Sequence, residues 1–237
     1  MTTRKLKTAV VLSMLSIGVL TLGNFDTCSA ANTVTIDNET VEEVVYAELL
    51  DTGIAADNVV NIKNDSVMNG EVYGAGSKAG DANKNTVNIS DSKTKNDVYA
   101  GYSFHGNAAD NQVNVIGSEL KNTGEKGIYG GYICDKGKVS GNTITVKNSR
   151  GSADLHAGFV KEYSADNTAE GNSIVMENSK FSSFVVGGGM ADSNAIGNSV
   201  KISKSTLEVN DSDDGVLFHR STILGAGPTG ARYRIMP

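Results

Sequence analysis

The chain has 237 residues, with 27 glycines, 2 prolines and no tryptophan, and its formal net charge at pH 7 is −6. An acidic balance argues against nucleic acids and anionic membranes as partners, because both repel a negative surface. The many Asn, Ser, Thr and Val residues favour strands and turns, which argues against a helical protein.

Residues 1–31 have the features of a secretory signal peptide. A basic start at Arg4, Lys5 and Lys7 precedes an apolar run over 8–23, and small residues follow at 29–31. This order is typical of a leader that is cleaved on export. The alternative, an uncleaved membrane anchor, would need a longer apolar run. We therefore predict that the chain is exported.

From residue 32 onward the chain repeats one phrase, an asparagine followed by two aliphatic residues that alternate with polar ones. After Asn85, for example, the sequence reads Thr86-Val87-Asn88-Ile89. The asparagines are 26 to 31 residues apart, and a steady period in this range indicates a repeat architecture. They are Asn32, Asn58, Asn85, Asn111, Asn142, Asn172 and Asn198.

A second phrase follows each first one, and Val98-Tyr99-Ala100-Gly101-Tyr102 is an example. Because side chains alternate along a strand, we expect Val98, Ala100 and Tyr102 to share the buried face and Tyr99 to point outward. A small apolar residue three positions before each later asparagine predicts a tight corner with an inward side chain.

Three short strands and three turns per repeat predict an all-β chain, a right-handed parallel β-helix (β-solenoid) of about seven coils with a period of 26–31 residues. A left-handed hexapeptide solenoid, the alternative, needs a six-residue period that is not visible. The large aliphatic side chains of one coil contribute roughly 5–9 kcal/mol, whereas ordering its backbone costs roughly 25–50 kcal/mol. Only a stack of coils is therefore stable. Stacked asparagines would pair amide to amide in a structural ladder of Asn58, Asn85, Asn111, Asn142, Asn172 and Asn198.

The repeats also predict the organisation of the chain. Residues 32–58 match the phrases least and are expected to form an N-terminal cap coil, and residues 59–227 form the β-helix repeats. Residues 228–237 differ in composition, and we expect an irregular end there, truncated or frame-shifted.

One outward column of side chains is the candidate binding surface. Its members are Tyr73, Tyr99, Tyr129 and His156, with Tyr46, Val186 and Leu224 in the same column of the aligned repeats. Stacked aromatic residues on a flat sheet can bind a glycan or a protein. The simpler role, a ladder that stabilises stacking, is the preferred one. The opposite face assignment, with the tyrosines in the core, also stays open.

The charged residues predict neither catalysis nor metal binding. Glycan hydrolysis needs two carboxylates facing one cleft, but the acidic residues change position from coil to coil, and the mid-chain Arg150 falls in a turn. His105, His156 and His219 share no zinc-ligand spacing with each other or with Cys134. We predict no catalytic residues, no metal site and no cofactor.

These units resemble the passenger region of type V autotransporter adhesins of Gram-negative bacteria. The resemblance rests on the Asn-x-Val-x-Ile and Val-Tyr-Gly-Gly phrases and the signal peptide, and it covers nearly all of residues 32–227. It implies export through the inner membrane, a cell-surface or extracellular location and an adhesive role. The family's translocator barrel would consist of many alternating ten-residue strands, and nothing after Gly227 has that pattern.

The sequence therefore favours a non-catalytic, adhesin-like surface β-solenoid, an autotransporter passenger fragment. Its expected partner is a protein or glycan on a host or neighbouring cell, with no nucleic acid and no direct membrane insertion by this segment. The competing class is a carbohydrate-active β-helix enzyme, a polysaccharide lyase or hydrolase. A non-functional gene remnant is the third possibility.

Overall fold

The computed structural model describes residues 31–122, 126–162, 164, 166–182, 185–187, 189, 194–208 and 222–224. Within these ranges every regular element is a β-strand. The predicted signal peptide up to residue 30, residues 209–221 of the last repeat, and the predicted irregular end at 228–237 lie outside the described residues.

The strands form four parallel sheets, each of which takes one strand from successive repeats. The first sheet contains β1 (Thr33–Asp37), β6 (Val59–Lys63), β10 (Thr86–Ser90), β14 (Gln112–Ile116), β18 (Thr143–Lys147), β22 (Ser173–Glu177) and β26 (Ser199–Ser203). The second contains β2 (Thr40–Val41), β7 (Val67–Met68), β11 (Lys93–Thr94), β15 (Glu119–Lys121), β19 (Arg150–Ser152), β23 (Lys180–Ser182) and β27 (Thr206–Glu208).

The third and fourth sheets complete each turn. The third contains β3 (Val45–Tyr46), β8 (Val72–Ala79), β12 (Val98–His105), β16 (Gly127–Ile133), β20 (Asp154–Val160), β24 (Val185–Gly187) and β28 (Thr222–Leu224), and β4 (Leu49–Thr52) also pairs with β8. The fourth contains β5 (Ala55–Ala56), β9 (Ala82–Asn83), β13 (Ala108–Ala109), β17 (Lys138–Ser140), β21 (Thr168–Glu170) and β25 (Asn194–Ile196).

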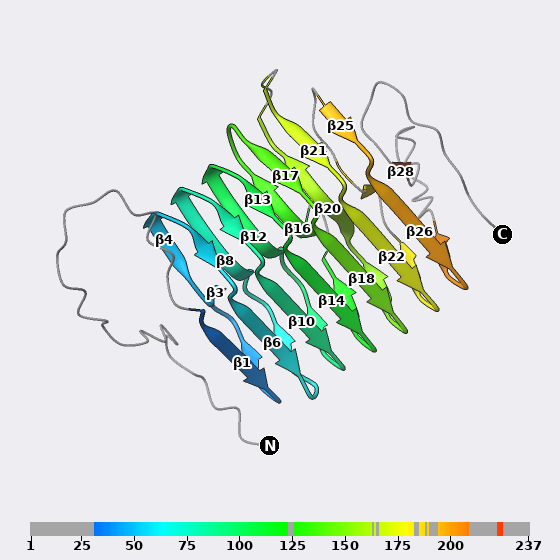
Figure 1. The fold of residues 1–237 in the computed structure, drawn as a ribbon. Helices are drawn as coiled ribbons and strands as arrows, with labels where there is room; N and C mark the ends of the chain where they lie inside the picture. The colour runs from blue at the N-terminus through cyan, green and yellow to red at the C-terminus, as the bar shows by residue number, and fades with distance from the viewer. Residues whose placement is uncertain are drawn as a thin grey trace, which may run out of the picture.

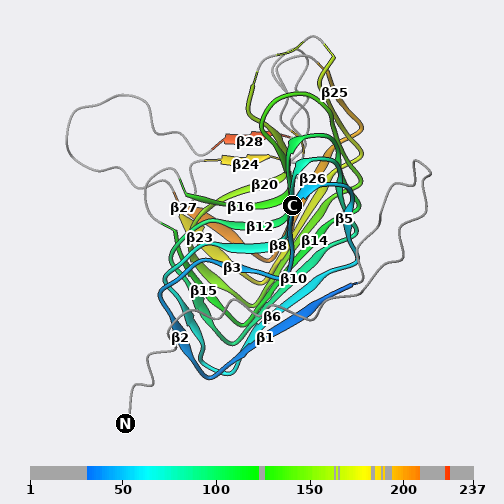
Figure 2. The ribbon, with the colours of Figure 1, turned by 90° about the vertical axis from the view of Figure 1, so that its left-hand side faces the viewer.

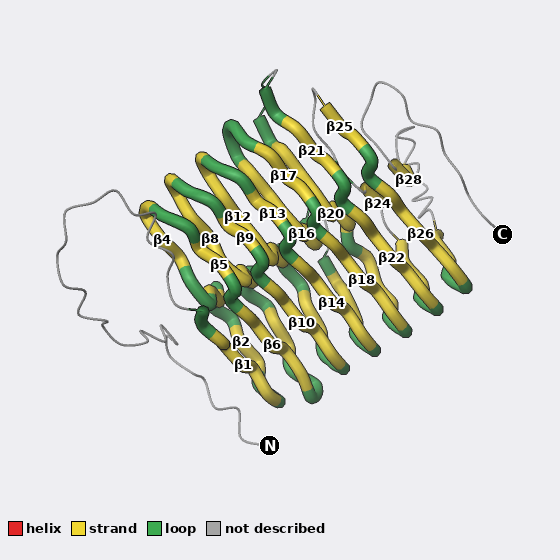
Figure 3. Tube along the Cα trace, in the orientation of Figure 1, coloured by secondary structure: helices red, strands yellow, loops and turns green. Residues whose placement is uncertain are grey.

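The strands stack as a β-solenoid, so the predicted fold class is confirmed (Figure 1). The seven strands of the first sheet mark seven levels of the solenoid. About six turns, each of about 27 residues, connect these levels. Figure 2 looks along the axis from the N-terminal coil, and the chain runs clockwise as it recedes, which makes the solenoid right-handed. Strands and turns each line up from coil to coil (Figure 3). Residues 32–58 form the first coil and contribute to all four sheets.

Two corners of each turn adopt the left-handed backbone conformation, with φ between 47° and 65°. One corner immediately precedes the asparagine that starts each repeat from Asn58 onward, and the other immediately precedes the serine that follows the first strand, or Glu39 in the first coil. The first group is Asp57, Lys84, Asp110, Gly141, Gly171 and Gly197, and the second is Asn38, Asp65, Asp91, Gly117, Asn148, Asn178 and Lys204. Asn, Asp and Gly tolerate this conformation best, which explains most of these positions.

The repeated aliphatic residues form one continuous core between the first three sheets. Val60, Ile62, Val87 and Val98 are among its members, and each has no accessible surface. The long third-sheet strands extend beyond the first core and meet the fourth sheet in a projection at the top of Figure 2, which we call the flange. A second, smaller core lies between these two sheets. Its members are Ala108, Ile133, Val139, Val160 and Ala169. Three of these are the predicted small apolar corner residues, and they do point inward.

The third sheet bends in the middle of its long strands, and one sequence prediction is therefore wrong. Tyr102 was expected on the buried face with Val98. Ala100 is buried in the core as expected, but the next residue, Gly101, also faces inward. A Cβ on Gly101 would point at the interior residue Asn111 and lie 2.3 Å from its side-chain nitrogen. Two consecutive inward positions break the alternation. Tyr102 consequently lies beside Tyr99, with ring centroids 5.7 Å apart.

A second correction concerns Val186, which the aligned repeats placed in the outward column after His156. In the structure Val186 pairs with Leu155, and Gly187 pairs with His156. The repeat is shifted by one residue, so Val186 occupies the register of the core residue Leu155 and not that of the aromatic column. Leu224 pairs with Gly187 and so keeps its expected register.

Candidate functional site

A ladder of asparagine side chains runs through the interior of the solenoid behind the bend of the third sheet. Asn58, Asn85, Asn111, Asn142 and Asn172 have no accessible surface. In the middle of the ladder, the side-chain nitrogen of Asn111 donates to Oδ1 of Asn142 at 2.9 Å, and the backbone N–H of Asn111 donates to the same oxygen at 3.0 Å. The same two bonds link the other neighbours from Asn58 to Asn198.

From Asn85 onward, each ladder amide also donates to a backbone carbonyl of the preceding turn. The side-chain nitrogen of Asn142 donates to the carbonyl oxygen of Ala108 at 2.9 Å, and that of Asn111 donates to Ala82 at 2.9 Å. Both acceptors are the small apolar residues three positions before an asparagine. From Asn58 to Asn172 the side-chain polar atoms are bonded and have no access to solvent, so the ladder is a structural element.

The aromatic residues form two adjoining columns on the outer side of the bend, which we call the aromatic corner. The first column consists of the predicted stripe Tyr46, Tyr73, Tyr99, Tyr129 and His156, whose neighbouring rings stack with centroids 4.6 to 5.2 Å apart. The second column consists of Tyr102, Tyr132 and Phe159, and its rings meet the first column edge to face. The bend, which the sequence did not reveal, brings the two columns together.

The second column covers much of the predicted stripe. Tyr99, Tyr129 and His156 are 9%, 8% and 5% exposed, whereas Tyr46, at the N-terminal end, is 39% exposed. The faces of the central rings contact one another, so they are not available to stack on a sugar. This arrangement supports a role in stability for the interior of the stripe.

Carboxylates hold the hydroxyl ends of the first column. The Tyr73 hydroxyl donates to Glu71 at 2.8 Å, and Asp97 accepts a hydrogen bond from Tyr99 and one from the backbone N–H of Gly127 at 2.6 Å. Burial is the main cause that raises the pKa of both tyrosines and of the Asp97 carboxyl. The tyrosines are therefore protonated donors at neutral pH and cannot serve as bases.

His156 makes the stability of the aromatic corner depend on pH. Burial lowers the pKa of its imidazole from 6.5 to about 4. The folded protein therefore keeps His156 neutral, while the unfolded chain takes up a proton below pH 6.5. Its stabilising contribution is complete above pH 6.5 and is lost as the pH falls from 6.5 towards 4. We expect the free energy of unfolding to drop by about 2 kcal/mol between pH 7 and pH 5 from this residue alone.

The variant His156→Phe, which keeps a ring in the column but cannot titrate, isolates this effect. Urea unfolding followed by circular dichroism at several pH values would measure it. The difference in stability between the variant and the natural chain should grow as the pH falls. Parallel curves for the two proteins between pH 7 and pH 5 would show that His156 is not buried in a neutral state.

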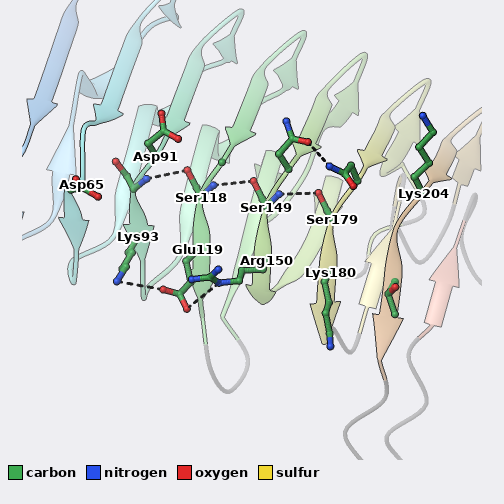
Figure 4. A pocket seen from close by; sticks show the side chains of 15 residues that line it. Asp65, Asp91, Lys93, Ser118, Glu119, Ser149, Arg150, Ser179, Lys180 and Lys204 are labelled. Atoms are coloured by element: carbon green, nitrogen blue, oxygen red, sulfur yellow. Dashed lines mark hydrogen bonds and ion pairs between the residues drawn. The ribbon is translucent and has the colours of Figure 1, made fainter.

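A groove of about 730 Å³ follows the turn between the first and second sheets, and we call it the turn groove (Figure 4). A serine ladder links the coils along it, with backbone N–H groups donating to the next serine oxygen at 3.0 to 3.2 Å. The charged residues that line the groove are Asp65, Asp91, Lys93, Glu119, Arg150, Lys180 and Lys204. Arg150, which the sequence placed in a turn, is the first residue of β19.

Glu119 is the centre of an ion-pair network in this groove. Its carboxylate lies 3.5 Å from Lys93, 3.4 Å from Lys121 and 3.7 Å from the Nε atom of Arg150. The Glu119 side chain is 18% exposed, whereas that of Arg150 is 74% exposed. The network surrounds the carboxylate with positive charge and leaves most of the Arg150 side chain at the surface.

Two further candidate residues, Cys134 and His105, lie at the ends of the neighbouring strands β16 and β12, and His219 lies outside the described residues. Cys134 is buried, with its sulfur 2.9 Å from the Tyr102 hydroxyl, and His105 lies 2.9 Å from Asp135 on the flange. In the part of the chain that the structure describes, no three His, Cys, Asp or Glu side chains gather as metal ligands would.

Comparisons with protein-family models, with curated proteins and with solved structures returned no match. The class of the protein, a parallel β-solenoid, therefore rests on the arrangement of its strands. Across the described ranges, no helix has the length and apolar character needed to cross a bilayer.

Proposed function

We propose that this chain is a non-catalytic, exported surface protein of the autotransporter-passenger type that mediates adhesion. The observation that carries the proposal is that outward side chains recur in register from turn to turn. Asn61, Asn88 and Asn114, for example, form a half-buried amide column on the first sheet, linked at 2.9 Å. A surface that repeats along an axis suits an extended or multivalent partner, because weak contacts add through avidity.

Two sequence features support the location and the class of partner. The basic and apolar leader at 1–31 favours export, and the phrases at 32–227 resemble those of passenger regions. The net charge of −6 disfavours nucleic acid and anionic membrane. The proposed partner is accordingly a protein or a glycan on the surface of a host or neighbouring cell.

An adherence assay tests this function. Fluorescent beads coated with the purified chain would be applied to cultured epithelial cells and to bacterial layers, with beads carrying the heat-unfolded chain as the control. We expect saturable adherence that free folded chain inhibits. Equal adherence of folded and unfolded chain would contradict the proposal. Release of unsaturated or reducing ends from acidic polysaccharides would favour a lyase or hydrolase instead.

A further inference from the structure

We propose that copies of this chain stack end to end, so that the last coil of one copy, residues 198–208, pairs with the first coil of the next. The inference goes beyond the proposed function and does not depend on it. Among the described strands, β1 and β26 are the outer strands of the first sheet, and β2 and β27 are those of the second (Figure 1). Each has a described neighbour on one side only, and such edges are templates for strands of another chain.

The aliphatic core is only partly covered at both ends of the stack. Inside the stack, core residues such as Val87 and Val113 have no accessible surface. The inward residues of the two end coils are instead partly buried, and they are Val34, Val41, Val45 and Ala47 in the first coil and Val200, Ile202 and Leu207 in the last. A further coil at either end would bury this apolar surface, which favours association.

A second copy fits these ends in register. When the two coils are aligned on Asn32 and Asn198, aliphatic residues lie opposite aliphatic residues at the inward positions. The pairs are Val34 with Val200, Ile36 with Ile202, and Val41 with Leu207. Inside the stack, Met176 pairs with Ile202 in the same way. The junction would therefore repeat the parallel pairing that joins one coil to the next.

Charge favours opposite ends as partners. Residues 32–58 contain seven acidic residues and no lysine or arginine, whereas residues 198–208 contain two lysines and one acidic residue. Both lysines, Lys201 and Lys204, are exposed, and in the aligned register Lys204 lies beside the exposed Glu39. Two first coils brought together would repel each other, because both are acidic. The contact is therefore expected between the first coil of one copy and the last coil of another.

Sedimentation velocity of the full chain over a range of concentrations, together with electron microscopy, would test the association. Because the two ends differ, the contact does not close on itself, and we expect reversible assembly into unbranched rods one solenoid wide. A chain that stays monomeric up to its solubility limit, or that forms only side-by-side dimers or shapeless aggregates, would overturn the inference.

Reversing the two charges of the last coil tests which surface is used. Lys201→Glu with Lys204→Glu would place like charges against the acidic first coil and should weaken association about tenfold. Lys136→Glu with Lys161→Glu makes the same change of charge at exposed positions after β16 and β20, in the middle of the stack. This control should alter association less than about twofold. Equal weakening by both variants would contradict an end-to-end contact.

Disulfide trapping tests the register, with Cys28→Ser in every variant. In the proposed contact Thr35 lies opposite Lys201, with Cα atoms about 4.8 Å apart, within the range of a disulfide. A chain with Thr35→Cys and Lys201→Cys should form a ladder of covalent multimers under mild oxidation, and either change alone should give dimers at most. The control, Thr35→Cys with Thr145→Cys, has its second cysteine inside the stack and should form no ladder. A ladder from the control, or none from the first pair, would overturn the proposed register.

Discussion

Replacing Asn142 by Ala should lower the free energy of unfolding by about 3–5 kcal/mol, because the cost of each unsatisfied buried group is about 1–3 kcal/mol. The Asn142 side chain accepts from the backbone N–H and the side-chain amide of Asn111. It also donates to Asn172 and to the Ala108 carbonyl. Alanine leaves these partners buried without a bond. Urea unfolding monitored by circular dichroism would measure the loss.

The outward amide column provides the matched control. Asn114 donates to Asn88 at 2.9 Å, as the ladder asparagines do to each other, but it is half-buried and its partner can bond to water. Asn114→Ala should cost less than about 1 kcal/mol. If the two variants lost the same stability, the interior ladder would not be the element that joins the coils.

Tyr99→Ala should destabilise the protein by about 3–5 kcal/mol, the usual cost of removing a buried aromatic side chain. Tyr99 stacks between Tyr73 and Tyr129 at 4.7 and 4.8 Å and also meets the edges of Tyr102 and Tyr132. Truncation would open a cavity at the centre of the aromatic corner. The midpoint of thermal unfolding would report the change.

Tyr46→Ala is the control for this experiment. Tyr46 is 39% exposed and stacks only on Tyr73 within the column, so its loss should cost about 1 kcal/mol. The two variants also separate the two roles considered for the stripe. A Tyr99→Ala protein that kept its stability but lost adherence to cells would identify the stripe as a binding surface rather than a stabilising ladder.

The sequence was sufficient to predict the solenoid because its main signal is local. Alternating residues such as Val87 and Ile89 have one buried face whatever the neighbouring coils contain, and the spacing of the asparagines sets the length of a turn. The stacking of the tyrosines also follows from repetition, since equivalent residues of successive coils must lie one above another.

The bend of the third sheet was not predictable in this way. Gly101 makes room there for the side chain of Asn111, which a Cβ would meet, and that contact exists only after the chain has turned a corner. The left-handed corners are similar. Asp57 and Gly141 suit this conformation, but Lys84 and Lys204 adopt it because the stack requires it there.

The turn groove could not be predicted without the register between coils. Each charged residue of its outer rim directly follows a ladder serine, as in Ser118-Glu119 and Ser149-Arg150. Aligning the serines would have placed these charges in one column. An arginine considered without this alignment gives no information about its neighbour one coil away.

The two ladders allow the length of the molecule to increase in proportion to its number of repeats. The bonds between ladder asparagines and those between ladder serines each join one turn to the next, and among the described residues none of them skips a turn. Duplicating one repeat between two asparagines would therefore recreate the same bonds at both new junctions. Each duplication would lengthen the protein by about 4.8 Å, so the reach of its surface can change in whole steps without a new fold.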